Sequence, residues 1–236
     1  LQKRDKGPSG RVKRVVEHQE RPMTGTVHVD EEGTRITPDG AVRYDFQVAG
    51  GLNGAKDKDK VQIRPKQDSR GDWTLAEIQS VFGTGQRARI CADAIIVRCG
   101  IPTEFPPEVM AQAEEISQMT VTQADIDERL DLRDEPIFTI DSADAKDLDD
   151  AISVHKTVDG YTLGVHIADV SHYVKAKTPI DNEAFRRGTS VYFADRVIPM
   201  LPEALSNGVC SLNAGTDKLT FSALMDFDNE GNMVDY

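Results

Sequence analysis

The chain has 236 residues, with 28 Lys and Arg against 40 Asp and Glu, which gives a formal net charge of −12. This length suits one large domain or two small ones, and 39% hydrophobic with 29% charged residues is typical of a folded globular chain. No apolar run approaches the roughly 18 residues of a membrane-spanning helix, so no membrane partner is expected. As a bulk number, the acidity also argues against a nucleic-acid partner.

The three cysteines are an odd number at wide spacings: Cys91, Cys99 and Cys210. They fit neither a disulfide framework nor a zinc site, so a reducing cytoplasm is the expected compartment. The first residues contain no apolar signal core, and nothing in them indicates secretion.

The charge is unevenly distributed along the chain. Residues 1–72 contain 15 basic and 12 acidic side chains, whereas residues 73–236 contain the other 13 basic and 28 acidic ones. The acidity is densest at residues 141–150, where five aspartates accompany one lysine. A charge run is usually a solvated loop, so any binding site here has to be weighed against that plain interpretation.

The first part of the chain carries the pattern of a small β-barrel. A strand is expected over residues 10–17, with no earlier partner in the sequence. Five further segments are short, β-branched and bounded by turn signals such as Pro38-Asp39-Gly40. They are residues 24–29, 34–37, 42–48, 60–64 and 73–78. Five short strands within about 60 residues predict an all-β barrel of the OB type.

Helices are expected after the barrel. Residues 86–99 are rich in Ala and Ile, residues 108–116 follow the favourable helix entry Pro106-Pro107, and residues 122–125 have the pattern of a capping box. We expect these helices to connect two domains, with their apolar positions used for packing.

From Pro136 the pattern becomes mixed. Residues 137–140 are expected to form a short buried strand that runs into the aspartate-rich stretch. Further strands are expected over 151–155, 161–167 and 219–227, and a short helix over 181–187 that Gly188 closes. The chain is therefore predicted to have a mixed fold, an OB-type barrel followed by an α+β domain. Its predicted parts are a strand and linker (1–19), the barrel (20–84), a helical connector (85–132) and the α+β domain (133–236).

The aspartate-rich stretch indicates a cation site. Two carboxylates about 4 Å apart repel by roughly 4 kcal/mol at an effective dielectric near 20, so a site that gathers several needs compensating charge. Lys146 is the one basic residue within residues 141–150. Mg²⁺ prefers oxygen ligands and is held by a few carboxylates together with substrate phosphates. Two such ions about 3.5–4 Å apart can stabilise the attacking and leaving oxygens of a phosphoryl displacement.

A calcium loop of the EF-hand type is a weaker match, because four of its five tested positions do not fit. The residues at positions 1, 3, 5, 6 and 12 are Asp141, Ala143, Ala145, Lys146 and Ile152. No Ser-His-Asp or Cys-His arrangement is evident, and His166 and His172 are interpreted as structural. A magnesium site for phosphodiester chemistry is the better interpretation.

Four motifs follow one another in the second part of the chain. They are TIDSADAKDLDD (139–150), GVHIADVS (164–171), RGTSVYF (187–193) with VIPMLP (197–202), and LSNGVCSLN (205–213). Together they closely resemble the catalytic domain of the ribonuclease II/ribonuclease R (RNB) family. The upstream barrel resembles the second cold-shock domain of the ribonuclease R type, with residues 10–17 as the last strand of the first such domain.

The resemblance implies a processive 3′-to-5′ exoribonuclease that hydrolyses single-stranded RNA and releases nucleoside 5′-monophosphates. It implies one or two Mg²⁺ ions held by four aspartates, Asp141, Asp147, Asp149 and Asp150, whereas Asp144 lies outside the pattern. Asp149 matches the aspartate whose loss most specifically removes catalysis.

The resemblance also implies RNA contacts. Tyr192 matches an aromatic residue that stacks near the 3′-terminal bases, and Arg187 of the same motif is a second expected contact. Cold-shock domains carry base-stacking aromatics on their second and third strands, but residues 28–38 contain no Phe, Tyr or Trp. Basic side chains of the barrel are therefore expected to contact the RNA backbone. These are Arg35, Arg43 and the lysines of residues 56–60.

The family's catalytic domain continues beyond the part that residues 133–236 match, and an OB-type RNA-binding domain follows it. We therefore expect a fragment with little or no activity alone, from a protein that is cytoplasmic and monomeric when complete. An RNA-binding module or a catalytically silent regulator is the alternative, and an acidic Ca²⁺-binding domain is a third. The intact set of four aspartates favours the enzyme.

Overall fold

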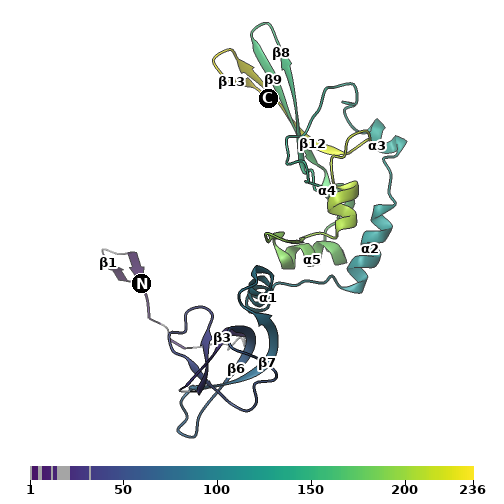
Figure 1. Cartoon of the computed structure of the whole chain (residues 1–236). Helices are drawn as coiled ribbons and strands as arrows, with labels where there is room; N and C mark the ends of the chain where they lie inside the picture. Colours follow the sequence, from purple (N-terminus) through teal and green to yellow (C-terminus); the bar gives the residue numbers. More distant parts are fainter. Residues whose placement is uncertain (1, 5–6, 12, 15–21, 32) are drawn as a thin grey trace. The chain divides into compact units, whose positions relative to one another are not determined.

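The computed structural model describes residues 2–4, 7–11, 13–14, 22–31 and 33–236 (Figure 1). Its internal contacts divide the chain into two units, Leu1–Ile101 and Pro102–Tyr236. The predicted fold class, an OB-type barrel followed by an α+β domain, is confirmed. Within the described ranges, no helix combines the length and the apolar character needed to cross a bilayer.

The first described strands form a hairpin, in which β1 (Gln2–Arg4) pairs with β2 (Gly7–Ser9). A strand was expected over residues 10–17. The four of those residues that the structure describes, 10, 11, 13 and 14, are not in a strand, and the rest of the range lies outside the described residues.

Five strands of the first unit close into a barrel in the order β3-β4-β5-β7-β6. They are β3 (Met23–Asp30), β4 (Gly33–Pro38), β5 (Phe46–Val48), β6 (Asp59–Lys66) and β7 (Leu75–Thr84). The prediction of a strand over the whole of residues 42–48 is wrong, because pairing begins only at Phe46. Residues 43–45 all face solvent. The apolar residue among them, Tyr44, therefore does not point into the barrel as the alternation of residues 42–48 predicted.

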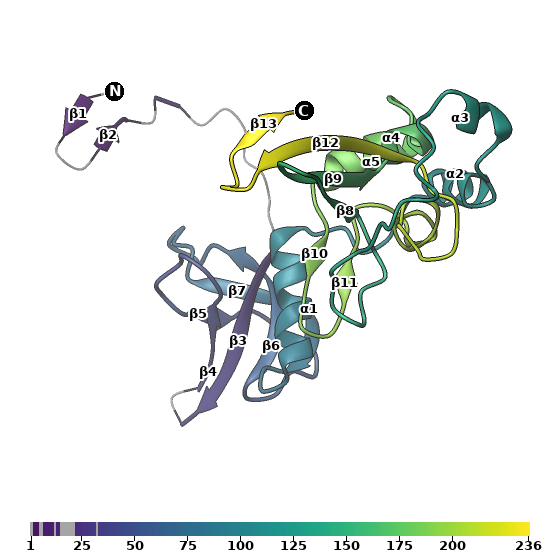
Figure 2. The same ribbon diagram turned by 90° about the horizontal axis from the view of Figure 1, so that it is seen from above.

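The barrel interior is filled by apolar side chains that are at most 3% exposed, as the alternation within strands predicts. They include Val27, Ile36, Phe46, Val61, Ile63 and Ile78. Gly25 is needed where β3 crosses β4, since a Cβ atom there would lie 2.7 Å from Ile36 Cγ2. Helix α1 (Ala88–Cys99) packs on β3, β6 and β7 and ends at Gly100, which has a φ of 64° (Figure 2).

The second unit contains the remaining helices, and three of the predicted helix signals are confirmed. Helix α2 (Pro107–Ser117) has proline at its first position, and α5 (Pro179–Arg187) ends at Gly188, which has a φ of 75°. Helix α3 (Gln123–Asp127) begins with the capping box of Thr122 and Asp125. The sequence did not predict α4 (Val170–Tyr173) or the π-helical turn η1 (Leu205–Val209). Helix α2 packs on α5 and η1 in the second unit, whereas α1 packs on the barrel of the first unit.

A four-stranded antiparallel sheet has the order β13-β12-β9-β8. Its strands are β8 (Asp150–Lys156), β9 (Gly160–Ala168), β12 (Thr220–Asp228) and β13 (Met233–Asp235). A separate pair joins β10 (Val191–Tyr192) to β11 (Val197–Ile198). The predicted strand over residues 137–140 is wrong, because only Phe138 bridges to Ile152. Ile140 is 79% exposed, so this apolar segment is not buried in the described unit.

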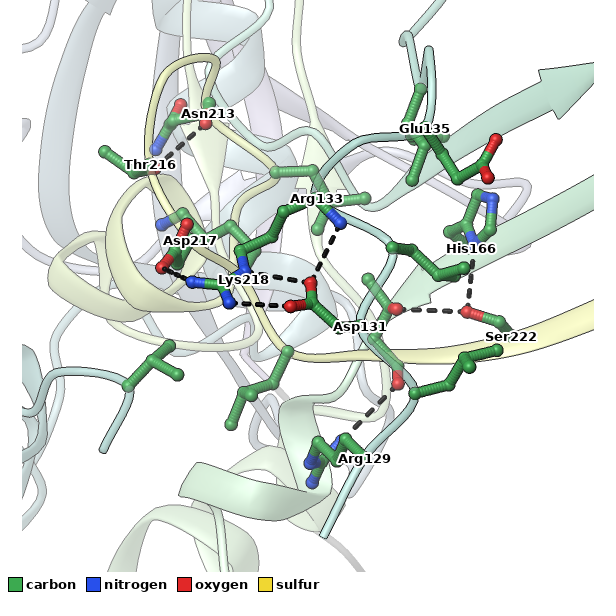
Figure 3. Close-up of a pocket in the computed structure, with 18 of the residues that line it drawn as sticks. Arg129, Asp131, Arg133, Glu135, His166, Asn213, Thr216, Asp217, Lys218 and Ser222 are labelled. Atoms are coloured by element: carbon green, nitrogen blue, oxygen red, sulfur yellow. Dashed lines mark hydrogen bonds and ion pairs between the residues drawn. The ribbon is translucent and has the colours of Figure 1, made fainter. Parts of the chain in front are cut away.

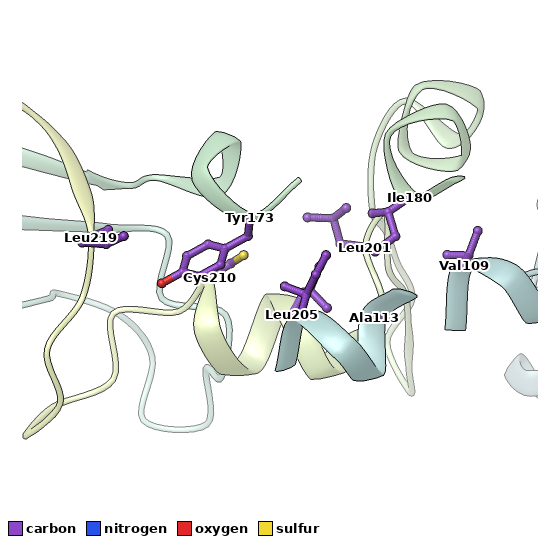
Figure 4. Close-up of a cluster of buried hydrophobic side chains, with 9 residues drawn as sticks. Val109, Ala113, Tyr173, Ile180, Leu201, Leu205, Cys210 and Leu219 are labelled. Carbon is purple, nitrogen blue, oxygen red and sulfur yellow. The ribbon is translucent and has the colours of Figure 1, made fainter. Parts of the chain in front are cut away.

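The core of the second unit lies between α2, α5 and η1 (Figure 4). Its buried members are Val109, Ala113, Ile116, Tyr173, Ile180, Leu201, Leu205, Cys210 and Leu219. Burial raises the pKa of the Cys210 thiol to about 11, so Cys210 is a packing residue rather than a reactive thiolate. Because this core contains η1 and Cys210, it fixes the start of the segment that follows, residues 211–213.

Candidate active site: the aspartate loop

The aspartate loop, residues 141–150, is fixed at its C-terminal half by hydrogen bonds from two other motifs. These bonds involve the main chain on both sides of Asp147. They are Leu148 N–H to Ser211 Oγ (3.0 Å), Ser211 Oγ–H to Lys146 C=O (2.9 Å), Leu212 N–H to Leu148 C=O (2.9 Å) and Ala168 N–H to Asp149 C=O (2.9 Å). The motifs that are separate in the sequence therefore meet at this loop.

The carboxyl group of Asp149 lies within electrostatic range of the other three predicted aspartates. Partial burial raises the pKa of the Asp149 carboxyl, and the negative charges of Asp147, Asp150 and Asp141 raise it further. Such mutual repulsion is the condition that a bound cation relieves. The donor set, carboxylate oxygens on one short loop, also has the chemistry that Mg²⁺ prefers.

The carboxylates do not yet converge. Among the residues that the structure describes, no three His, Cys, Asp or Glu side chains form a group that could hold a metal ion. The N-terminal half of the loop also has fewer hydrogen bonds to the rest of the unit than the C-terminal half. Within the described residues 139–145, the hydrogen bond found is the local one from Ala145 N–H to Ser142 C=O (3.0 Å). Asp141 belongs to this half, so its position depends less on the rest of the fold than that of Asp147 or Asp149.

Tyr192 contacts the loop through its hydroxyl, which donates a hydrogen bond to Asp147 Oδ2 at 3.0 Å. That bond to a carboxylate raises the pKa of the Tyr192 hydroxyl. The residue is 64% exposed, and its stacking on a terminal base stays a prediction. The contact with Asp147 was not predicted, because residue spacing carries no signal for a contact between residues 45 positions apart.

Arg187 has a different environment from the one predicted. Its side chain is 3% exposed, pairs with Glu183 at 2.9 Å and lies over the ring of Phe105 at 3.7 Å. Its guanidinium also donates to three main-chain carbonyls, those of Pro102 (3.1 Å), Pro199 (3.1 Å) and Glu104 (2.6 Å). These donors are used within the protein, so the geometry gives Arg187 a structural role and lends no support to its predicted RNA contact.

The two predicted arginines of the barrel are both at the surface. Arg35 pairs with Asp30 and, at 3.2 Å, with Asp45, so its charge is largely offset. Arg43 is exposed. In the predicted lysine-rich loop, Lys60 pairs with Asp39 at 2.5 Å.

The barrel has exposed aromatic residues outside residues 28–38. Tyr44 is 52% exposed and packs edge-on against Phe46, with 5.3 Å between ring centroids. Trp73 is 54% exposed. The pairing of β5 with β7 brings their segments together, since Gln47 N–H donates to Thr74 C=O at 2.9 Å. These exposed aromatic residues were missed because the sequence analysis tested only residues 28–38.

A cavity of about 900 Å³ lies behind the loop, and Leu148 is part of its lining (Figure 3). His166 in its wall is 1% exposed, and both ring nitrogens are engaged, with Ser153 Oγ (3.1 Å) and Ser222 Oγ (2.9 Å). Burial lowers the pKa of His166, which keeps the ring neutral. Asp150 lies opposite Ile167 in the sheet, so its side chain is on the other face from His166. This geometry favours the structural interpretation of His166.

The cationic side chains of the same cavity are engaged within the protein. Arg129 pairs with Asp169 at 2.7 Å. Arg133 pairs with Asp131 at 2.6 Å (Figure 3). Lys218 donates to the carbonyl of Gly208 at 2.8 Å, and burial lowers its pKa. The cavity therefore contributes little net positive charge to the aspartate loop.

Residues 129–236 match the RNB domain, so this part of the chain belongs to the ribonuclease II/ribonuclease R (RNB) family. Within that family it is similar to proteins called ribonuclease R. It is 46% identical over 235 residues to ribonuclease R of Thermotoga maritima. The aligned region covers 97% of this chain and 33% of that relative. The chain thus spans about a third of the length of that relative.

Solved structures show the same relationship. A Mycoplasma genitalium RNase R in complex with double-stranded RNA superposes with a TM-score of 0.74 and 29% identity, covering 95% of this chain and 40% of that one. Yeast Ssd1, described as a pseudonuclease, superposes with a TM-score of 0.60 and 16% identity over 92% of this chain and 28% of its own. At that identity the likeness concerns the fold alone, so the fold by itself does not decide between catalysis and silence.

Proposed function

We propose that this chain is part of a Mg²⁺-dependent exoribonuclease that hydrolyses single-stranded RNA from its 3′ end and releases nucleoside 5′-monophosphates. The observation that carries the proposal is the aspartate loop, where contacts from the other motifs hold a set of carboxylates whose charges raise the pKa of Asp149. Membership of the RNB family supports RNA as the substrate, as do the RNA complexes of the related RNase R.

In this proposal the residues have separate tasks. Asp147, Asp149 and Asp150 would supply oxygen ligands from the C-terminal half of the loop, and Asp141 would supply one from its N-terminal half. Bound Mg²⁺ supplies positive charge that neutralises the carboxylates and lowers the pKa of a water molecule. Tyr192 orients Asp147 through its hydroxyl and offers its exposed ring to a terminal base.

A catalytically silent RNA-binding protein is the second candidate. It is favoured by the absence, among the described residues, of three carboxylates already close enough to hold a cation. The enzyme remains the better proposal because all four aspartates of the family pattern are present, and a silent protein has no need to keep them.

The test compares two aspartates of the same loop in a protein of the relatives' full length that contains this segment. Such a protein should shorten 5′-labelled single-stranded RNA stepwise in Mg²⁺, and EDTA should stop it. Asp149→Asn should abolish cleavage with RNA binding nearly unchanged, whereas Asp144→Asn, outside the pattern, should cleave normally. Cleavage by Asp149→Asn at the parental rate would refute the assignment. The 236-residue chain alone should show little or no cleavage.

A further inference from the structure

Ser211 is a buried hydroxyl that bridges two main-chain groups of the aspartate loop. It is 0% exposed and directly follows the core residue Cys210. Its Oγ accepts a hydrogen bond from Leu148 N–H at 3.0 Å and donates to the Lys146 carbonyl at 2.9 Å. A serine hydroxyl has one donor and two acceptor sites, so one side chain satisfies both groups. Asn213 Oδ1 lies farther from the same hydroxyl, at 3.4 Å.

The two hydrogen bonds of Ser211 flank Asp147, one of the predicted ligands, in the chain. Lys146 and Leu148 are its neighbours on either side, so the hydroxyl fixes the peptide groups that flank it. The next residue, Asp149, is fixed through its own carbonyl by Ala168 N–H at 2.9 Å. Without the Ser211 hydroxyl, the Leu148 N–H and the Lys146 carbonyl would both lose this partner, and the segment would have to shift to find others.

The position of Ser211 is in turn determined by packing. The core around Leu205 and Cys210 holds the segment on one side, and Leu212 N–H bonds to the Leu148 carbonyl at 2.9 Å on the other. The Ser211 hydroxyl therefore holds the C-terminal half of the aspartate loop against the core. The described N-terminal half has only a local hydrogen bond. Supporting contacts of this kind orient ligands, and their loss typically weakens metal affinity by about 10–100-fold.

We propose that Ser211 is a positioning residue that sets the spacing of Asp147 and Asp149 for a divalent cation. This inference rests on the proposed function, since it takes the aspartate loop to be the cation site. It assigns Ser211 no contact with RNA or with the cation itself.

The test measures binding of Mn²⁺, a paramagnetic substitute for Mg²⁺, by electron paramagnetic resonance on the 236-residue chain without RNA. Ser211→Ala should weaken Mn²⁺ binding by about 10-fold or more. Ser206→Ala is the matched control, because its hydroxyl lies in the preceding turn η1 and, among the described residues, bonds to its neighbour Asn207 at 3.3 Å rather than to the aspartate loop. The control should bind Mn²⁺ like the parent. Far-UV circular dichroism and thermal midpoints establish that each variant is folded at the temperature of measurement.

Asp149→Asn separates failure of the inference from failure of the proposed function. If Asp149→Asn weakens Mn²⁺ binding but folded Ser211→Ala keeps the parental affinity, the positioning role is refuted. If Asp149→Asn binds like the parent, or the parent shows no saturable binding, the proposed cation site is refuted as well. Should Ser211→Ala not fold, Ser211→Cys decides, because its somewhat larger thiol fills the same position but forms weaker hydrogen bonds. It should bind several-fold more weakly, and parental affinity would overturn the proposal.

Discussion

The environment of Arg187 predicts a loss of stability, rather than a loss of RNA binding, when its charge is removed. Arg187→Met keeps an unbranched apolar side chain against Phe105 but removes the ion pair with Glu183 and the bonds to three carbonyls. Breaking a buried ion pair on one side costs about 3–5 kcal/mol. Arg186 still pairs with Glu183 at 2.5 Å, so we expect the lower end, about 3 kcal/mol, and a fall in thermal midpoint of roughly 10 °C.

The assay can follow the two units separately because the chain has a single tryptophan, Trp73, in the first unit. The midpoint seen by far-UV circular dichroism should fall in Arg187→Met, while the transition seen by Trp73 fluorescence should not move. Arg186→Met is the matched control, since Arg186 is 54% exposed and shares the same partner, and it should change the midpoint much less. Weakened RNA binding by Arg187→Met with unchanged midpoints would refute this reasoning and restore the predicted RNA contact.

Three further predictions concern other residues. Single-stranded oligouridine should quench Trp73 fluorescence, and Tyr44→Ala should lower the affinity that this titration measures. The absence of quenching at saturation would exclude base stacking at this edge of the barrel. Burial keeps the pKa of His166 below its unfolded value near 6.5, so the unfolded chain binds more protons and stability should fall as the pH drops below about 6.5. In His166→Gln the urea midpoint should depend less on pH, and an unchanged dependence would argue against this cause. Tyr192→Phe should weaken Mn²⁺ binding without preventing it, because Asp147 loses one hydrogen-bond donor while the aromatic ring is kept. An affinity equal to that of the parent would show that the hydroxyl does not orient Asp147.

The sequence predicted those features of the fold that depend on neighbouring residues. The ends of α2, α3 and α5 follow from Pro107, the capping box of Thr122 and Asp125, and Gly188, each of which acts within one helical turn. The barrel strands follow in the same way from alternation between turn signals. Such signals are complete within a short window, so no tertiary information is needed to recognise them.

The strand wrongly predicted over residues 137–140 depends on partners distant in the chain. These residues have the composition of a buried strand, but one bridge to Ile152 leaves Ile140 exposed. Other contacts were not predicted for the same reason. The guanidinium of Arg187 bonds to carbonyls up to 85 positions away, and the hydrogen bonds of Ser211 to the aspartate loop span 63 and 65 positions. None of these contacts leaves a periodic signal in the sequence. The RNA contact of Arg187 came from the family resemblance and stays a prediction.

The charge distribution distinguishes the aspartate loop from the rest of the acidic part of the chain. The acidic excess lies in residues 73–236, but several of its carboxylates are paired, as Asp131 with Arg133 and Asp169 with Arg129 show. The aspartate loop differs, because its own charges raise the pKa of Asp149 instead of being offset by an arginine. Under the proposed function, a divalent ion is the charge that relieves this repulsion, because Arg129 and Arg133 of the neighbouring cavity are engaged with acids of their own.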